Sequence, residues 1–312
     1  MRLVQTSKAP HPVSSLLLLL VLMIVGSLVG TLLAMVIAVI TSGMTDLSSI
    51  MLAMESPAND LNFFRIVQGG SSIGMCVIPA LVLGMVEKRL HEYAPLTTSN
   101  LQIRHFILVF VLVLTSGAVI EWLGKLNSHL TLPERLSGLE QWMYSQEMQL
   151  EEITITILSD ISVGGFLANL LVIAVIPAIG EELLFRGALQ SIFLRWFRNP
   201  HVAIWVAAII FSVIHLQFYG FLPRLALGAL FGYLFFWSKN LWLPIFAHFV
   251  NNAGILLVTF ILQRRGNSLD SMDYMDDISI PVYLISFAIT AGLLWMLWRQ
   301  LGSGHKKGIG PI

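Results

Sequence analysis

The sequence predicts an all-α fold: a polytopic membrane protein built as a bundle of about eight transmembrane helices. Of the 312 residues, 56% are hydrophobic and 12% are charged, whereas a soluble domain carries about 25% charged residues. The mean hydropathy of +0.80 excludes an ordinary soluble globule and a disordered chain. We therefore expect membrane lipids to be partners of this chain.

The charge balance and the cysteine content exclude two further classes. The 18 Lys and Arg equal the 18 Asp and Glu in number, so the basic surface that a nucleic-acid-binding protein needs is not expected. Cys76 is the only cysteine, which excludes an internal disulfide framework and a metal site built from several cysteines.

Eight stretches supply the roughly 20 mostly apolar residues that a transmembrane helix needs. The first is longer than the ~7–15 apolar residues of a signal peptide, so we expect it to remain as a tilted helix. No linker or internal repeat separates the stretches, which predicts one membrane domain over residues 1–312. The expected spans are residues 15–40, 64–86, 105–125, 163–184, 201–217, 221–237, 241–262 and 280–299.

An even number of spans places both termini on one side of the membrane, and the basic residues indicate which side. Lys and Arg concentrate in cytoplasmic loops, so we expect both termini in the cytoplasm and the protein in the cytoplasmic membrane. The basic residues on this side are Arg2, Lys8, Lys88, Arg89, Arg104, Arg186, Arg195, Arg198, Lys239, Arg299, Lys306 and Lys307.

Two segments outside the spans are expected to form surface helices. Leu and Met residues recur at near-helical spacing within residues 126–160. Residues 184–200 mix aromatic side chains with three arginines, which is typical of a cytoplasmic interfacial helix, and Pro200 is expected to end it.

Three G-x-x-x-G pairs lie inside the spans. Small residues four apart let helix backbones approach closely, so the pairs predict a tight bundle. They are Gly26 with Gly30, Gly70 with Gly74, and Gly228 with Gly232.

Charged residues interrupt the end of the fourth span, where a charge costs at least ~2.5–3.5 kcal/mol at mid-membrane. Glu182 and Arg186 lie about 40° apart around a helix, so they are expected to pair. Glu181 lies about 140° from Arg186 and points elsewhere. Pro177 removes one backbone donor just before this segment and is expected to kink the helix.

Polar side chains also interrupt the fifth and seventh spans. Phe211 and His215 share one face of the fifth, and His248 and Asn252 share one face of the seventh. Interhelical hydrogen bonding explains one such residue well. It explains poorly an acid, two histidines and an amide spread over three helices.

Glu181, His215, His248 and Asn252 are sufficient for hydrolysis of a peptide bond by water. A buried carboxylate can act as general base, and a neutral His can hold the same proton. A second His and an Asn amide can donate to a developing oxyanion. One Glu with two His is also a zinc ligand set, so Glu181, His215 and His248 could equally bind Zn²⁺, and the residues leave both chemistries open.

The same residues resemble a known family. EELLFR (Glu181–Arg186) matches E-E-x-x-x-R, FSVIH (Phe211–His215) matches F-x-x-x-H, and HFVNN (His248–Asn252) matches H-x-x-x-N. In this order on membrane helices, they resemble the CPBP family of intramembrane proteases. That family includes the CAAX prenyl endopeptidases and bacteriocin-processing proteins, and it is also called the Abi family.

The resemblance implies an eight-helix fold with a cytoplasm-facing polar cavity inside the membrane, and a catalytic core over about residues 163–262. It implies that Glu181 and His215 activate water and that His248 and Asn252 stabilise the oxyanion. Glu182, Arg186 and Phe211 would support the site. The expected substrate is a peptide or protein, membrane-anchored substrates included. The family is described both as metalloproteases and as metal-independent glutamic proteases, so zinc stays open.

Other interpretations compete with this one. GSSIG (Gly70–Gly74) fits G-x-S-x-G with Ser72 as nucleophile, but that motif works in a strand–turn–helix setting, and here it lies in an apolar helix. Cys76 is expected to be a small buried hydrophobe. A proton-coupled transporter also uses intramembrane Glu and His. A non-catalytic bacteriocin-immunity or scaffolding protein of the same fold is the remaining alternative.

Overall fold

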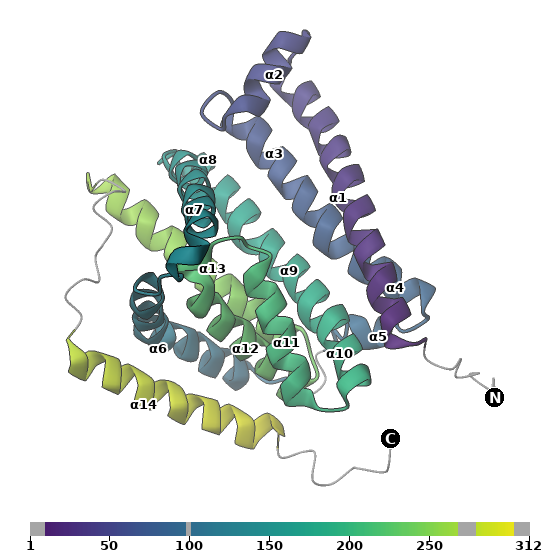
Figure 1. Ribbon diagram of the computed structural model, residues 1–312, viewed down its shortest axis with the longest axis vertical. Helices are drawn as coiled ribbons and strands as arrows, with labels where there is room; N and C mark the ends of the chain where they lie inside the picture. Colours follow the sequence, from purple (N-terminus) through teal and green to yellow (C-terminus); the bar gives the residue numbers. More distant parts are fainter. Residues whose placement is uncertain (1–9, 98–100, 268–278, 303–312) are drawn as a thin grey trace.

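The structure is a computed structural model that describes residues 10–97, 101–267 and 279–302. These residues form a helical bundle with no strand among them, as Figure 1 shows. Within these ranges, seven helices are long and apolar enough to cross a membrane. The all-α polytopic membrane class is therefore confirmed. Arg2, Lys8, Lys306 and Lys307, on which part of the expected orientation depends, lie outside the described residues.

The N-terminal third is a helical hairpin. α1 (Pro12–Ser42) begins directly after its N-cap residue, His11. It ends at its C-cap residue, Gly43, whose backbone is left-handed, a conformation that glycine takes without strain. α2 (Leu47–Glu55) and α3 (Leu61–Ser72) each begin after an aspartate whose side chain accepts a backbone N–H. α3 continues through a π-helical turn, η1 (Ile73–Val77), into α4 (Ile78–Val86).

The G-x-x-x-G pairs bring helices into close contact, as predicted. A Cβ atom added at Gly74 would overlap the Gly26 carbonyl, and one added at Gly30 would overlap the Gly70 carbonyl. α1 and the α3–η1 helix therefore pack backbone against backbone. A Cβ at Gly228 would lie 3.1 Å from the Cβ of Ala208, which places α12 equally close to α11.

The fourth expected span continues further than predicted. α8 (Val163–Asn169), η3 (Leu170–Val175), α9 (Ile176–Glu182), η4 (Leu183–Leu189) and α10 (Gln190–Phe197) follow one another without a break. The prediction of a separate interfacial helix over residues 184–200 is therefore wrong. No Pro interrupts residues 178–197, and residues 183–189 are buried. The helix ends at Phe197, and Pro200 begins the next helix.

The fifth expected span is shorter than predicted. α11 (Pro200–Val213) has 14 residues, or about 21 Å, against a hydrocarbon thickness of about 30 Å. The expected range 201–217 was too long because Leu216 adopts a left-handed backbone with φ 54°, and the chain turns there. It continues through η5 (Phe218–Gly220) into α12 (Phe221–Ser238).

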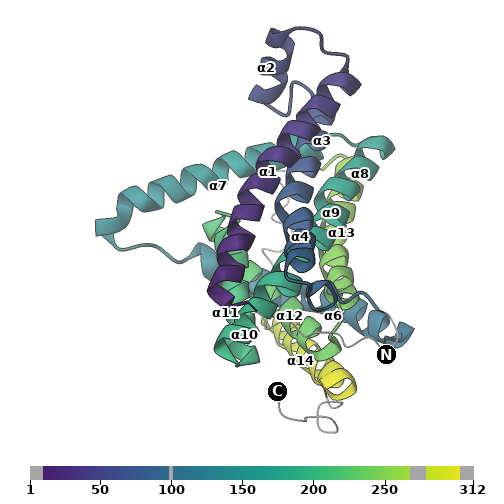
Figure 2. The same cartoon turned by 90° about the vertical axis from the view of Figure 1, so that its right-hand side faces the viewer.

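The remaining helices surround this core. They are α5 (Leu90–Tyr93), α6 (Ile103–Ser128), η2 (Glu134–Leu136), α7 (Ser137–Leu158), α13 (Trp242–Arg264), α14 (Ile280–Leu297) and η7 (Trp298–Gly302). α7 is the helix expected within residues 126–160, and Figure 2 shows that it projects away from the bundle.

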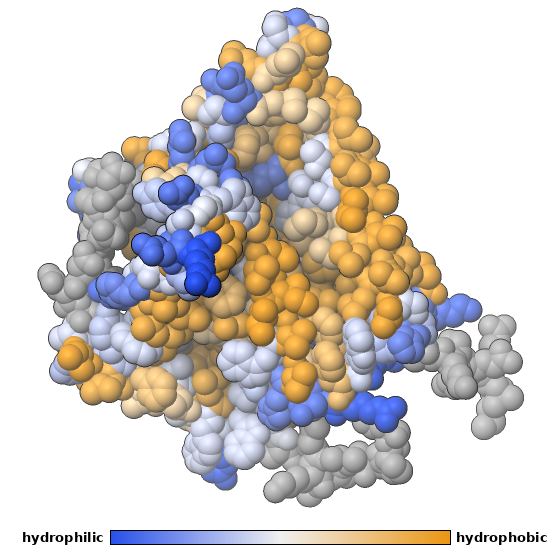
Figure 3. Space-filling view, in the orientation of Figure 1, coloured by the Kyte–Doolittle hydropathy of each residue, from blue (hydrophilic) through white to orange (hydrophobic). Residues whose placement is uncertain are grey.

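The two ends of the bundle differ in the segments that they hold. Figures 1 and 2 place α10 and the start of α1 at one end, and α2, α8 and the end of α13 at the other. At the first end, Arg195 of α10 donates to the Tyr93 hydroxyl and lies 3.6 Å from the Glu87 carboxylate. Between the ends, Figure 3 shows a broad apolar surface over α1 and its neighbours, as a lipid-facing belt requires.

Candidate active site

Glu182 and Arg186 form the ion pair that their spacing predicts. Arg186 Nη1 lies 2.7 Å from Glu182 Oε1, and both side chains are buried. Arg186 Nη2 donates to the Gly228 carbonyl of α12 at 2.9 Å. A buried charge needs such partners, so this pair also ties η4 to α12.

His248 of α13 lies between the two glutamates. Its Nδ1 is 2.8 Å from Glu182 Oε1, and its Nε2 is 3.8 Å from Glu181 Oε2. Glu182 Oε1 therefore serves both Arg186 and His248, and it orients the imidazole ring. The spacing of the sequence motifs does not predict this contact between His248 and Glu182.

Aromatic rings enclose this cluster. Phe231 of α12 stacks on His248 with 5.2 Å between ring centroids and 21° between planes. The Arg186 guanidinium carbon lies 4.8 Å from the Phe211 ring centroid and 5.3 Å from that of Phe231, within the range of cation–π attraction. The sequence analysis missed Phe231 and the Gly228 carbonyl, because α12 is rich in aromatic and small residues and none of them stands out.

His215 lies two residues after the end of α11 at Val213. Its Nδ1 lies 2.6 Å from the Phe211 carbonyl oxygen, and its ring contacts Phe211 edge-on at 4.8 Å. Because a carbonyl only accepts, Nδ1 carries the hydrogen, and Nε2 keeps a lone pair when the ring is neutral. Glu181 lies within electrostatic range of His215.

Asn252 lies one helical turn beyond His248 and bonds to the fourth span. Its Nδ2 donates to the Ile173 carbonyl at 3.0 Å. In an α-helix that carbonyl would accept from residue 177, but Pro177 has no N–H to give. The proline is thus accommodated by the π-helical turn η3 and by this amide. One hydrogen of Nδ2 stays available, because an amide nitrogen has two.

Two carboxylate oxygens of the cluster are buried and accept no hydrogen bond from the described residues: Glu181 Oε2 and Glu182 Oε2. Of the two, Glu181 Oε2 faces His248 Nε2, at 3.8 Å. Buried polar atoms are otherwise almost always paired, and an ordered water commonly fills such a position. The side chain of Glu181 is therefore available to bind a water that faces His248.

The expected site residues converge to different degrees. Glu181, Glu182, Arg186 and His248 are joined by ion pairs, and Phe211 covers them. His215 reaches them through Phe211 and the charge of Glu181, and Asn252 reaches the fourth span at Ile173.

The alternative nucleophiles, Ser72 and Cys76, lack the setting that their chemistry needs. Ser72 ends α3, which continues directly into η1, so the strand–turn–helix setting of a nucleophilic serine is not formed there. Cys76 is buried. Its Cβ packs against Gly180, where an added Cβ would lie only 3.1 Å away. Cys76 therefore packs as a small apolar side chain.

The proposed zinc ligands do not form a ligand cluster. Among the described residues, no group of three His, Cys, Asp or Glu side chains is arranged so that it could hold a metal ion. Nδ1 of His215 and Nδ1 of His248 face a carbonyl and a carboxylate, so only the two Nε2 atoms could serve as metal donors. In this arrangement, Glu181, His215 and His248 are therefore not gathered into a zinc site, and no step of the chemistry below depends on a metal.

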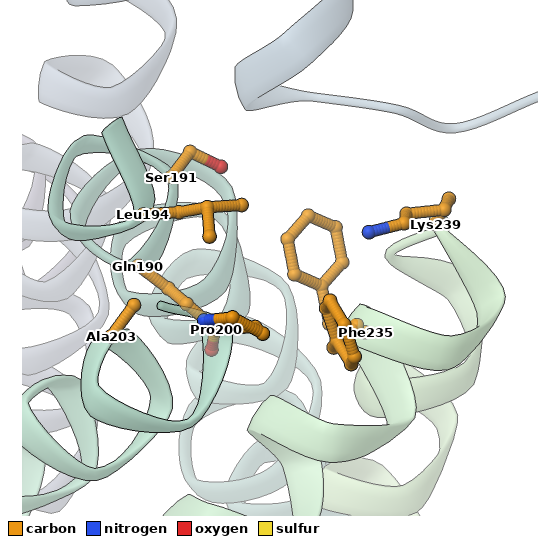
Figure 4. A pocket seen from close by; sticks show the side chains of 8 residues that line it. Gln190, Ser191, Leu194, Pro200, Ala203, Phe235 and Lys239 are labelled. Carbon is orange, nitrogen blue, oxygen red and sulfur yellow. The ribbon is translucent and has the colours of Figure 1, made fainter. Parts of the chain in front are cut away.

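A separate small pocket lies beside the first half of α10. Figure 4 shows the residues that line it, from α10, α11 and the end of α12, among them Gln190, Pro200, Phe235 and Lys239. Its volume is about 20 Å³. It begins about two helical turns beyond Glu182, so it is distinct from the cluster around His248.

Comparison with known proteins identifies the part of the chain that carries this cluster. Residues 163–254 match the family model described as "Type II CAAX prenyl endopeptidase Rce1-like". This range of the chain contains all three motifs. "Uncharacterized protein YpbD" of Bacillus subtilis (strain 168) is 30% identical over 89 residues, which cover 27% of this chain and 42% of that protein. The match thus spans less than half of that relative. None of the solved structures matches this chain.

Proposed function

We propose, from the match of residues 163–254 to the Rce1-like family of type II CAAX prenyl endopeptidases, that this membrane protein is an intramembrane endopeptidase. The observation that carries the proposal is the buried Glu181 Oε2, which has no hydrogen-bond partner among the described residues and faces His248 Nε2 at 3.8 Å. A carboxylate held in this way can bind and deprotonate a water.

In the proposed reaction, a water donates one hydrogen to Glu181 and the other to His215 Nε2. Its oxygen attacks the peptide carbonyl carbon while Glu181 takes a proton. The tetrahedral oxyanion is stabilised by His248 Nε2–H, when both ring nitrogens of His248 are protonated, and by the second hydrogen of Asn252 Nδ2. The C–N bond then breaks, and Glu181 returns the proton to the leaving amine.

Glu182, Arg186 and Phe231 have supporting roles in this proposal. Glu182 accepts from His248 Nδ1, which keeps Nε2 directed toward Glu181. Arg186 compensates the charge of the buried Glu182. Phe231 and Phe211 keep water away from this pair, and a drier site strengthens its electrostatic interactions.

An apolar groove beside the cluster is proposed to bind the apolar part of a membrane-anchored substrate. The groove has a volume of about 290 Å³ and lies between α1, η4, α10 and α11. Phe185 lines it and contacts Phe211 edge-on at 5.1 Å, so one aromatic layer separates the groove from His215 and His248. Its lining residues are Leu16, Leu19, Leu20, Met23, Leu184, Phe185, Leu189, Phe193, Ile210 and Ile214.

The orientation in the membrane is also a proposal. The positive-inside rule assigns the end that holds Arg89, Arg195 and Lys239 to the cytoplasm. Both termini would then be cytoplasmic, in the cytoplasmic membrane.

The proposal is tested by comparing the membrane proteomes of cells that carry wild-type protein, Glu181→Gln or the control Glu55→Gln. Glu55 is exposed at the end of α2. We expect an uncut precursor to accumulate with Glu181→Gln alone, and its cleavage by purified wild-type protein to continue in the presence of 1,10-phenanthroline.

Several outcomes would contradict the proposal. Normal processing by Glu181→Gln, or loss of processing in Ser72→Ala, would mean that another residue is the catalyst. Inhibition by phenanthroline that zinc reverses would indicate metal chemistry. Proton-coupled uptake into proteoliposomes that Glu181→Gln abolishes would favour a transporter, and a protective function that survives Glu181→Gln would favour the non-catalytic immunity role.

A further inference from the structure

The segment that carries His215 has a backbone that its own residues do not favour. After α11 ends at Val213, Leu216 adopts φ 54°, a left-handed conformation that a branched side chain rarely takes. Leu216 is 42% exposed, so packing of its side chain does not explain this conformation. Other parts of the molecule must hold the segment between His215 and α12.

Asn127 of α6 holds this segment with both ends of its amide. Its Nδ2 donates to the Phe218 carbonyl at 2.7 Å, and its Oδ1 accepts from the Leu222 backbone N–H at 2.8 Å. Asn127 is only 4% exposed. One backbone group at the start of η5 and one at the start of α12 are thereby fixed to α6.

Neighbouring residues complete the attachment. Arg224 Nη1 donates to the Gln217 carbonyl at 3.0 Å, and Ser212 Oγ donates to the Phe221 carbonyl at 2.7 Å. Both donors belong to α11 or α12, the helices that the segment joins. Asn127 differs because α6 lies outside residues 163–254, the range that matches the protease family. Glu147 of α7, which also lies outside this range, accepts from the Tyr219 N–H at 3.4 Å, a longer contact than either bond of Asn127.

We infer that Asn127 is a positioning residue for His215. The inference rests on the proposed function only for the action of His215 on the reacting water. By fixing residues 218 and 222, Asn127 holds the turn at Leu216, and the turn sets the direction of the imidazole. The Nδ1 bond to the Phe211 carbonyl then leaves Nε2 free. The proposed catalytic geometry thus depends on a helix outside the matched core.

The test compares Asn127→Ala and Asn127→Asp with Asn240→Ala as a matched control. Asn127→Asp keeps the acceptor for Leu222 and loses the donor to Phe218. Asn240 is also 4% exposed, and it fixes a different loop by donating to the Thr97 carbonyl and accepting from Trp242 N–H. The first measurement is the rate at which diethyl pyrocarbonate modifies His215 in the purified full-length protein, read by mass spectrometry. The second is kcat and KM on the precursor found with Glu181→Gln.

For both Asn127 variants, we expect modification of His215 to accelerate at least about threefold, and kcat to fall at least about tenfold with KM within about twofold of wild type. Asn240→Ala should change neither. A wild-type modification rate in Asn127→Asp, or an equal change in Asn240→Ala, would overturn the inference. The modification rate needs no substrate, so it decides the role of Asn127 even if no precursor exists and the proposed function fails.

Discussion

Glu182 and His248 share a hydrogen bond of 2.8 Å between Oε1 and Nδ1, although 66 residues separate them in the chain. The same carboxylate oxygen accepts from Arg186 at 2.7 Å. This bond brings the fourth and seventh expected spans together at the level of Glu181. It also turns Nε2 of His248 toward the carboxylate of Glu181.

Removal of Arg186 should destabilise the bundle strongly. Arg186→Ala leaves the buried Glu182 without its cation, and breaking a buried ion pair by removing one partner costs about 3–5 kcal/mol. Glu182→Gln leaves the buried Arg186 without its anion, so it should lower stability by a similar amount and lower turnover as well. Thermal denaturation in detergent measures the effect, with the exposed Arg135→Ala as control. An unchanged melting temperature in Arg186→Ala would show that this ion pair does not support the fold.

The glycine contact between α1 and the α3–η1 helix should not tolerate a side chain. A Cβ at Gly74 would overlap the Gly26 carbonyl, and overpacking of this kind costs about 1–3 kcal/mol. Gly117 of α6 is the control, because a Cβ built there meets no described atom within 4 Å. We expect Gly74→Ala to lower the melting temperature in detergent and Gly117→Ala to preserve or raise it. Equal tolerance at both positions would contradict the close packing.

A bulky residue in the apolar groove should weaken substrate binding. Leu20 lines the groove and is 54% exposed, whereas Leu17 on the same helix is 60% exposed and is not among the lining residues. We expect Leu20→Trp to raise KM about tenfold with little change in kcat, the pattern of lost uniform binding. Leu17→Trp should match wild type on the same precursor. Equal kinetics for the two variants would exclude the groove as a substrate site.

The stability of the contact between Glu147 of α7 and the Tyr219 N–H should depend on pH. Burial raises the pKa of Glu147, although the Tyr219 N–H and the charge of Arg224 act in the opposite direction. A carboxyl whose folded pKa exceeds its unfolded pKa stabilises the fold when protonated, and this contribution is lost as pH rises through that window.

Glu147→Gln is uncharged at every pH. Its melting temperature relative to wild type should therefore be higher at about pH 7 than at about pH 4. The exposed Glu152→Gln on the same helix is the control. A difference between Glu147→Gln and wild type that stays constant across this range would show that Glu147 does not titrate in this way.

Features that depend on helical periodicity could be predicted from the sequence. The spacing of Glu182 and Arg186 predicts their ion pair, which forms. The Gly26, Gly30, Gly70 and Gly74 spacing predicts a close helix contact, which also forms. Both follow from 3.6 residues per turn. The apolar stretches likewise predict the membrane bundle, because the length of a spanning helix is set by the bilayer.

Partners on different helices were decided only by the tertiary structure. No spacing pairs His248 with Glu182, the Ile173 carbonyl with Asn252, or Asn127 with the segment after His215. The rotation and the neighbours of each helix are set by packing over the whole bundle, which local periodicity does not describe. For the same reason, the helix that was expected to end near residue 184 continues to Phe197, with residues 183–189 buried in the bundle that the other helices form.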